Sequence, residues 1–135
     1  MDKSFGWQMV ELKFVAPNRP LSENESRRMH WAQRSKRLSE WKLMTMVYYK
    51  KLSDENKKKL HGKKIKITVT LPFKTKSRRD AHNYISTNVK TIIDALVKCQ
   101  MIPDDTSDYI EVIEPKLLPN SIYCIIKLEP IGDYE

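Results

Sequence analysis

The clearest structural pattern in the chain is KIKITVTL, residues 64–71, in which polar and apolar side chains alternate without a break. A period of two puts Ile65, Ile67, Val69 and Leu71 on one face of a β-strand and the Lys and Thr residues on the other. One such face packs in the core while the other meets solvent. The stretch therefore predicts a half-buried strand near the middle of the sequence.

The segments before this strand predict a strand, a long helix and a loop. A first strand is expected near Trp7–Val15, where apolar and polar residues again alternate. Ser22 and Glu25 form an S-x-x-E capping box, which predicts that a helix begins there and runs toward Lys51. Residues 54–64 are polar and are expected to form a loop.

The segments after it predict a second helix and a closing hairpin. The helix is expected over about residues 83–99, where apolar residues recur at helical spacing. The hairpin strands are expected over Tyr109–Ile113 and Ile122–Leu128. The predicted order is β-α-β-α-β-β. It gives an α+β fold with one domain over residues 1–135, in which two helices pack against a mixed sheet.

Composition excludes several classes of protein. Hydrophobic residues make up 40% of the 135 residues and charged residues 31%, as in soluble globular proteins. No apolar run approaches the roughly 18 residues of a membrane span, and the N-terminus lacks a signal-peptide pattern. The two cysteines predict a reducing, cytoplasmic setting. Cys and His follow no zinc pattern and no glycine-rich phosphate loop is present, so we expect no membrane partner and no small-molecule cofactor.

The net charge of +8 is divided unevenly along the chain. Residues 1–79 carry 21 Lys and Arg against 7 Asp and Glu, whereas residues 80–135 carry 4 against 10. A basic surface binds polyanions by releasing counterions from phosphates, although the same charge also suits an ordinary solvated surface. The acidic part favours the first interpretation, because carboxylates that bind a metal ion attract a nucleic-acid backbone rather than repel it.

A polar stripe is expected on the predicted second helix. Its members, at helical spacing, are Asn83, Thr87, Lys90 and Asp94. Taken alone, such a stripe is the solvent-facing side of an amphipathic helix. Carboxylates flank the helix, however, with Asp80 before it and Asp104 and Asp105 after it. Asp80, Asp94 and Asp105 converge only if tertiary folding brings them together, which the spacing permits.

Carboxylates at these positions suit phosphodiester chemistry. Mg²⁺ takes oxygen ligands, usually one or two carboxylates, while waters and substrate phosphates complete its shell. A bound cation acidifies a ligand water and offsets charge on the phosphate. Lys90, one turn from Asp94, would neutralise the transition state, and its alternative role is an i,i+4 ion pair with Asp94.

These residues, in this order, resemble the RusA-type Holliday junction resolvases. The similar motifs are Arg78-Arg79-Asp80-Ala81-His82-Asn83, then Lys90, then Asp94-Ala95-Leu96, then Pro103-Asp104-Asp105. The stretch from Pro20 through Trp31 to Arg37 looks like the first helix of that family. The resemblance covers about residues 17–113.

The resemblance implies an endodeoxyribonuclease of DNA recombination and repair, a homodimer that nicks four-way junctions symmetrically with Mg²⁺ or Mn²⁺. It implies that Asp80 and Asp105 are catalytic metal ligands with Asp104 beside them, and that Lys90 is the catalytic lysine. Asp94 is expected to join the metal site. A two-fold dimer suits the pseudo-two-fold symmetry of a junction. A short, basic resolvase would suit a bacterium or a phage equally.

Two departures from the family pattern bear on the site. The family's second aspartate is His82 here, and imidazole is a poor ligand for Mg²⁺ and a fair one for Mn²⁺. His82 is expected to bind the metal, to shuttle a proton, or to take no part. The interval before Asp94 is also about one helical turn longer than usual. Lys90 is therefore aligned by its distance to Asp94, and Thr87 and Asn88 are alternatives.

Basic residues next to this site are expected to hold DNA phosphates. The nearest group is the loop set Lys74, Lys76, Arg78 and Arg79. A second group on the predicted first helix extends the footprint or is simply solvated: Arg27, Arg28, Arg34 and Arg37. Trp31 or Tyr84 either stacks on an unpaired base or belongs to the core or a subunit interface. The rival function is a DNA-binding protein that has lost catalysis, with His82 as the mark of that loss.

Overall fold

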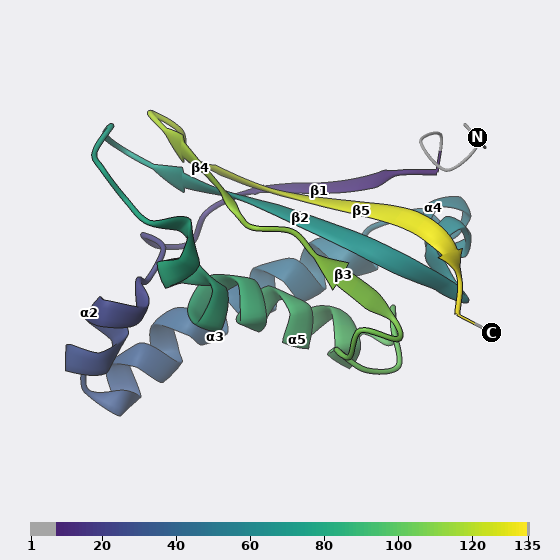
Figure 1. The fold of residues 1–135 in the computed structure, drawn as a ribbon, viewed down its shortest axis with the longest axis horizontal. Coiled ribbons are helices and arrows are strands. Elements are labelled where there is room, and N and C mark those ends of the chain that lie inside the picture. The colour runs from purple at the N-terminus through teal and green to yellow at the C-terminus, as the bar shows by residue number, and fades with distance from the viewer. Residues whose placement is uncertain (1–7, 135) are drawn as a thin grey trace.

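The computed structural model describes residues 8–134 as an α+β fold, in which a mixed five-stranded sheet is covered by helices (Figure 1). The strands are β1 (Val10–Val15), β2 (Lys63–Phe73), β3 (Ile110–Val112), β4 (Lys116–Pro119) and β5 (Tyr123–Asp133). The helices are α2 (Glu23–Arg28), α3 (Trp31–Lys50), α4 (Asp54–Leu60) and α5 (Lys90–Lys98). A 3-10 turn, η1 (Ala81–Tyr84), and a π turn, η2 (Ile85–Val89), lead into α5. The predicted fold class is confirmed.

Strand β2, which contains the stretch 64–71, is central in the sheet. Strand β5 pairs antiparallel with β2 and also with β1, while β3 and β4 pair in parallel with successive parts of the other edge of β2. Val69 lies opposite Ile126, and Ile126 lies opposite Leu12, so the apolar residues of three strands share one face. The predicted alternation is confirmed, because the four apolar residues of 64–71 are fully buried.

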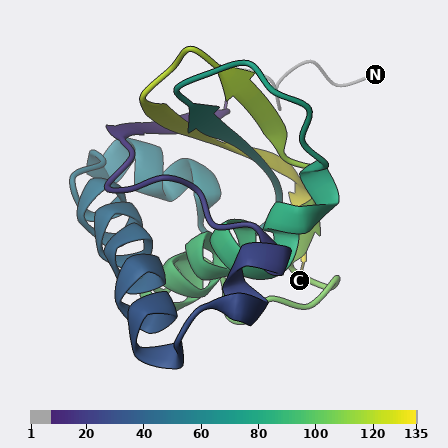
Figure 2. The same ribbon diagram turned by 90° about the vertical axis from the view of Figure 1, so that its left-hand side faces the viewer.

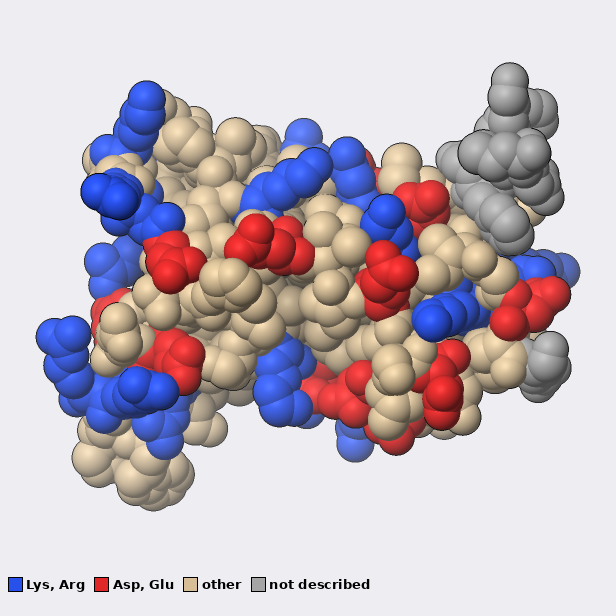
Figure 3. Space-filling model, in the orientation of Figure 1, with Lys and Arg blue, Asp and Glu red and all other residues tan. Residues whose placement is uncertain are grey.

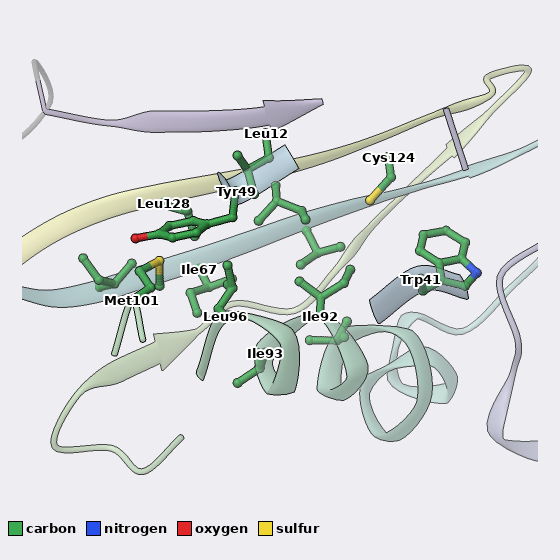
Figure 4. Close-up of a cluster of buried hydrophobic side chains, with 14 of the residues drawn as sticks. Leu12, Trp41, Tyr49, Ile67, Ile92, Ile93, Leu96, Met101, Cys124 and Leu128 are labelled. Atoms are coloured by element: carbon green, nitrogen blue, oxygen red, sulfur yellow. The ribbon is translucent and has the colours of Figure 1, made fainter. Parts of the chain in front are cut away.

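Helices α3 and α5 cover this apolar face of the sheet (Figures 1 and 2). Trp41 and Tyr49 from α3 belong to the same buried cluster as Ile92 and Leu96 from α5 and the buried strand residues (Figure 4). Burial of each such side chain contributes about 1.5–3 kcal/mol. The core therefore fixes α5 against β2, and the residues that connect the two carry the candidate site. Within residues 8–134, none of the helices has the length and apolar character that a membrane crossing requires.

The predicted long helix is in fact two helices, α2 and α3, with a break at Met29 and His30. The capping box acts as predicted at the start of α2, where Oγ of Ser22 accepts a hydrogen bond from the backbone N of Glu25 at 3.1 Å. A second cap follows at His30, whose Nδ1 accepts from the backbone N of Ala32 at 3.2 Å. Because this second cap satisfies a new helix start, the chain turns a corner between two helices.

Two other local predictions are wrong. Residues 54–60 form α4 instead of a loop, because Oγ of Ser53 caps the first turn by accepting from the backbone N of Asn56 at 3.1 Å. The closing hairpin does not form, because β3 pairs in parallel with β2 and β5 pairs with β1 and β2. A crossover through α5 joins β2 to β3, and crossovers of this kind connect parallel strands. The first strand begins at Val10, and Trp7 lies outside the described residues.

Candidate functional site beside strand β2

A surface hollow of about 650 Å³ lies where the chain leaves β2 and turns back into η1. Its walls come from that loop, from η1 and from the residue that caps α2: Arg78, Arg79, Asp80, Ala81, Asn83, Tyr84 and Ser22. The hollow therefore brings part of the predicted basic loop together with Asp80, the first of the predicted carboxylates.

Asp80 lies on this hollow as the N-cap of η1. Its Oδ1 accepts a hydrogen bond from the backbone N of His82 at 3.0 Å, and its carbonyl O accepts from the backbone N of Asn83 at 3.1 Å. An aspartate here satisfies amides that the start of a helical turn leaves without partners. The carboxylate is thereby held in place while its side chain stays exposed, so it is available to a cation or a water molecule.

Aromatic contacts hold η1 against the end of β2. The ring of Tyr84 packs edge-on against Phe73 with centroids 5.4 Å apart, and the Arg79 guanidinium lies 4.0 Å from the Phe73 ring centroid. Nη1 of Arg79 also donates to the carbonyl O of Thr75 at 3.0 Å, which folds the basic loop back on itself. Burial raises the pKa of the Tyr84 phenol, although the nearby Arg79 charge lowers it, and the phenol is neutral at physiological pH.

His82, the residue that departs from the family pattern, lies next to a carboxylate that is not among the predicted site residues. Its Nε2 lies 3.1 Å from Oε1 of Glu114. Glu114 lies in the break between β3 and β4, the two strands that run beside β2. Both side chains are largely exposed, at 72% for His82 and 57% for Glu114. A partner for His82 would have been visible in sequence only if the parallel pairing of β3 with β2 had been predicted.

The polar stripe predicted on the second helix is interrupted by the π turn. Thr87 and Asn88 are buried in η2. Oδ1 of Asn88 accepts from the backbone N of Leu21 at 2.8 Å, and the Thr87 hydroxyl donates to the carbonyl O of Leu21. A π turn takes more residues per turn than an α-helix, so it changes which residues share a face. Thr87 and Asn88 hold the chain before α2 in place, so neither is available as the alternative to Lys90.

Lys90 and Asp94 lie one turn apart at the start of α5. Nζ of Lys90 is 3.3 Å from Oδ1 of Asp94, with the two side chains 59% and 43% exposed. The ion pair that was the alternative role for Lys90 is therefore present. An exposed pair of this kind contributes only about 0.3–0.5 kcal/mol, so it leaves the Lys90 ammonium able to contact a phosphate as well.

Asp104 and Asp105 lie in the exposed loop between α5 and β3, whereas Asp80 precedes η1 at the other end of the helical segment. Oδ1 of Asp104 accepts from the backbone N of Asp105 at 2.8 Å. The helical segment from η2 through α5 lies between this pair and Asp80 in the chain, and it is about 20 Å long at 1.5 Å per residue. The chain therefore does not bring Asp80 and Asp105 together. In residues 8–134, no three His, Cys, Asp or Glu side chains are grouped closely enough to hold a metal ion.

The predicted DNA-contact residues fall into two groups. In the loop after β2, Lys74, Lys76 and Arg78 are exposed and point their charge to solvent, while Arg79 is partly covered. Basic side chains also gather over α2 and the start of α3, and acidic side chains lie between these two basic regions on the face that Figure 3 shows.

Among the arginines of α2 and α3, Arg37 has a different role from the one predicted. Its guanidinium donates to the carbonyl O atoms of Arg19 and Pro20, at 2.6 and 3.2 Å, and pairs with Glu25 at 3.3 Å. Its side chain is only 17% exposed, so it fixes the loop before α2. The other three arginines are placed differently. Arg27 is exposed and paired with Glu23, Nη1 of Arg34 donates to the carbonyl O of Ser26 at 3.1 Å, and Arg28 is exposed.

The two aromatic residues considered for base stacking differ in exposure. Tyr84 is 7% exposed and belongs to the core, whereas Trp31 is 67% exposed at the first position of α3. Of the two, only Trp31 presents an aromatic surface to a ligand.

Comparison with known proteins adds no family assignment to this geometry. No protein-family model matches the chain, and no curated protein matches it. The resemblance to the RusA-type resolvases therefore stays a prediction from the residues.

Proposed function

We propose that this protein is a metal-dependent endodeoxyribonuclease that nicks branched DNA, four-way junctions among its substrates. The observation that carries the proposal is the placement of Asp80 and Glu114. Asp80 accepts a hydrogen bond from the backbone N of His82 and shares a surface hollow with Arg78 and Arg79, while Glu114 lies 3.1 Å from the His82 imidazole. Phosphodiester hydrolysis of this kind requires cationic side chains that bind the phosphate and oxygen ligands that bind a metal ion. Basic residues beside acidic ones supply both.

The basic loop after β2 would hold the DNA backbone. Lys74, Lys76 and Arg78 are exposed, and the Arg79 guanidinium is oriented by Phe73 and by the carbonyl O of Thr75. Contacts of Lys and Arg with phosphates position a nucleic acid without reading its sequence. We therefore expect DNA binding that weakens steeply as the salt concentration rises.

The donor set fits a hydrated hard cation. Asp80 is an exposed carboxylate on the hollow, and Mg²⁺ is usually held through one or two carboxylates plus waters and substrate phosphates. When bound there, Mg²⁺ or Mn²⁺ would acidify a ligand water and offset charge on the phosphate.

His82 and Glu114 would act together on a proton. Oε1 of Glu114 lies 3.1 Å from Nε2 of His82, so it would restrain the ring and leave Nδ1 as the nitrogen that faces away from this carboxylate. His82 in this state would take a proton from the attacking water. Lys90, which the resemblance makes the catalytic lysine, would place its ammonium near the phosphate while Asp94 restrains it.

The role that the resemblance gives to Asp104 and Asp105 fits a dimer better than a single chain. Helix α5 separates this pair from Asp80 within one chain. A site that uses all three carboxylates would therefore take Asp105 from a second protomer of the proposed homodimer. Two such sites, related by a two-fold axis, would meet equivalent strands of a junction.

The proposed setting is the cytoplasm of a bacterium or of a phage-infected cell. Cys99 and Cys124 are free thiols, as a reducing compartment maintains them.

The second candidate function is DNA binding without catalysis. It is favoured by the exposure of the His82–Glu114 pair and by the lack of a grouped set of three metal ligands in the described residues. This alternative predicts that junction binding is indifferent to divalent metal. It also predicts that no metal supports nicking.

The test is a cleavage panel that crosses metals with substrates. Wild-type protein and His82→Asp are incubated with a four-way junction, a linear duplex and a single strand, each with Mg²⁺, Mn²⁺, Ca²⁺ or chelator. We expect symmetric nicks in the junction with Mn²⁺ and Mg²⁺, and a shift of preference toward Mg²⁺ in His82→Asp, because carboxylate is the harder ligand. Intact junctions in every metal would refute nuclease activity, and retained binding in those lanes would support the alternative.

A further inference from the structure

Trp31 is the most exposed large apolar side chain in the described part of the chain, at 67%. It is the first residue of α3, and its ring stacks against that of His30 with centroids 5.8 Å apart and planes at 29°. We infer that Trp31 is a stacking platform for an unpaired DNA base. The inference rests on the proposed DNA substrate and adds to it a residue that recognises unpaired nucleotides.

The local structure presents the indole to solvent and holds it there. Residues 30–33 are all exposed, and the first buried residue of α3 is Trp41, so the start of the helix extends past the core. His30 is fixed because its Nδ1 caps the helix by accepting from the backbone N of Ala32. The imidazole covers one face of the indole, which leaves the other face to a flat partner. A ring held in this way loses little freedom when a base stacks on it.

The charges around Trp31 favour a nucleic acid as the partner. Arg27, Arg28 and Lys36 are exposed nearby in sequence on α2 and α3. The acidic residues of α2 are already paired, Glu23 with Arg27 and Glu25 with Arg19 and Arg37. Basic residues that track a backbone beside an aromatic ring that stacks on bases are the combination that binds single strands.

The residues next to Trp31 argue against a protein or membrane partner. Ala32, Gln33, Ser35 and Lys36, the exposed neighbours of Trp31 along α3, are mostly polar, so they do not extend the indole into a wide apolar patch. Apolar protein interfaces and membrane contacts need such a patch. A single ring needs only one base of matching area, and every base has such a face.

Helix α2 lies between the platform and the candidate active site. Helix α2, which precedes Trp31, contacts both η1 and η2, and its cap Ser22 lines the same hollow as Asp80. The α2–α3 corner with its basic side chains is on the same side of the molecule as the loop after β2 (Figures 1 and 3). DNA held at the loop would therefore bring a neighbouring unpaired base, as at a junction crossover, to Trp31.

The experiment measures how much stacking of a DNA base on Trp31 contributes to binding affinity. Fluorescence anisotropy gives the affinity of the full chain for a labelled single strand of roughly 12 nucleotides, and for the same strand with abasic sites at its centre. The variants are Trp31→Phe, Trp31→Leu and, as a matched control on the same helix, Leu43→Ala, since Leu43 is 60% exposed. We expect removal of the bases to weaken wild-type binding by about fivefold or more, the lower range of aromatic stacking.

The variants decide the outcome. Trp31→Phe and Leu43→Ala should keep most of the difference in affinity between the intact strand and the abasic strand. Trp31→Leu should bind the two strands with the same affinity. The inference would be overturned if removal of the bases lowered the affinity equally in wild type and Trp31→Leu. It would also be overturned if wild type bound neither strand. A change of oligomeric state in Trp31→Leu, seen by sedimentation, would also overturn it by placing Trp31 in a subunit interface. Junction nicking is scored separately, so a failed nuclease proposal and a failed stacking inference give different results.

Discussion

Nε2 of His82 lies 3.1 Å from Oε1 of Glu114, and this contact joins the turn after β2 to the break between β3 and β4. The contact would give His82 a function other than filling the place of an aspartate. A carboxylate that holds an imidazole sets the ring orientation and the nitrogen that accepts a proton.

Glu114→Gln should slow junction nicking without weakening DNA binding. The amide keeps the shape of the side chain but loses the charge that orients His82, and loss of such a partner typically lowers activity by about 10–100-fold. The control is Glu111→Gln, because Glu111 is an exposed carboxylate on β3 close by in sequence. Single-turnover nicking rates measure the effect. Equal rates for the two variants would remove Glu114 from the mechanism.

A double variant, Lys74→Ala with Lys76→Ala, should lower the salt dependence of DNA binding. Each phosphate contact contributes about 0.9 to the slope of log affinity against log salt, so the slope should fall by about 2. Lys50→Ala with Lys58→Ala removes the same charge from lysines of α3 and α4, near the other end of the sheet. That control should leave the slope nearly unchanged, and a similar fall in both variants would mean that the loop holds no phosphate.

Arg37→Ala should destabilise the fold, and Arg27→Ala should not. Arg37 holds the carbonyl O atoms of Arg19 and Pro20 and is 17% exposed, whereas the Arg27–Glu23 pair is exposed on α2. Loss of charged hydrogen bonds to a partly buried loop should lower the free energy of unfolding by about 2 kcal/mol. The exposed pair contributes at most about 0.5 kcal/mol. Urea unfolding of both variants measures the difference. Comparable unfolding midpoints for Arg37→Ala and Arg27→Ala would contradict the prediction.

A mixture of Asp80→Asn and Asp105→Asn should nick junctions although each variant alone does not. If each site draws Asp80 from one protomer and Asp105 from the other, half of the sites formed in a mixed dimer contain no substitution. The mixed dimer is made by denaturing and refolding the two variants together. Its activity is then measured by a nicking assay. Activity in either variant alone would show that its aspartate is dispensable, and an inactive mixture would exclude a site shared between protomers.

Stability should fall on the alkaline side of about pH 9. Burial raises the pKa of the Cys124 thiol in the folded chain far above its ordinary value, and it also raises the pKa of the Tyr49 phenol. A raised folded pKa means that the stabilisation is complete below the unfolded pKa and is lost as the pH rises above it. Each pH unit in that range removes about 1.4 kcal/mol per such group. Urea unfolding at rising pH should therefore show a steeper decline for wild type than for Cys124→Ala.

The parts of the fold that local sequence determines were predictable. Residues 64–71 alternate strictly because that strand has one buried and one solvent-facing side, and Ser22 caps α2 through a contact only three residues long. The corner at Met29 and His30 was not predictable, because no glycine or proline marks it and the new helix is capped by His30, which is not one of the usual cap residues. The pairing of β3 with β2 was also missed, since a crossover brings together strands that are far apart in sequence.

The candidate site was predictable in part for the same reason. Asp80 was singled out because it precedes a helix and follows a basic loop, and both features are local. Glu114 was missed because its contact with His82 depends on the parallel arrangement of β3 and β2. Arg37 was grouped with the DNA-contact residues because it lies on a basic helix. Its structural role was not predictable, because the sequence does not show which carbonyl groups its guanidinium contacts.

The most direct test of the central proposal is the nicking of a synthetic four-way junction by Asp80→Asn, with junction binding measured on the same samples. The asparagine side chain would keep the cap of η1 while losing the charge that a cation needs. We predict that wild type nicks the junction with Mn²⁺ or Mg²⁺. Asp80→Asn should bind it within about twofold of wild type but nick it at least about 100-fold more slowly. Nicking by Asp80→Asn at the wild-type rate, or no nicking by wild type in either metal, would contradict the account.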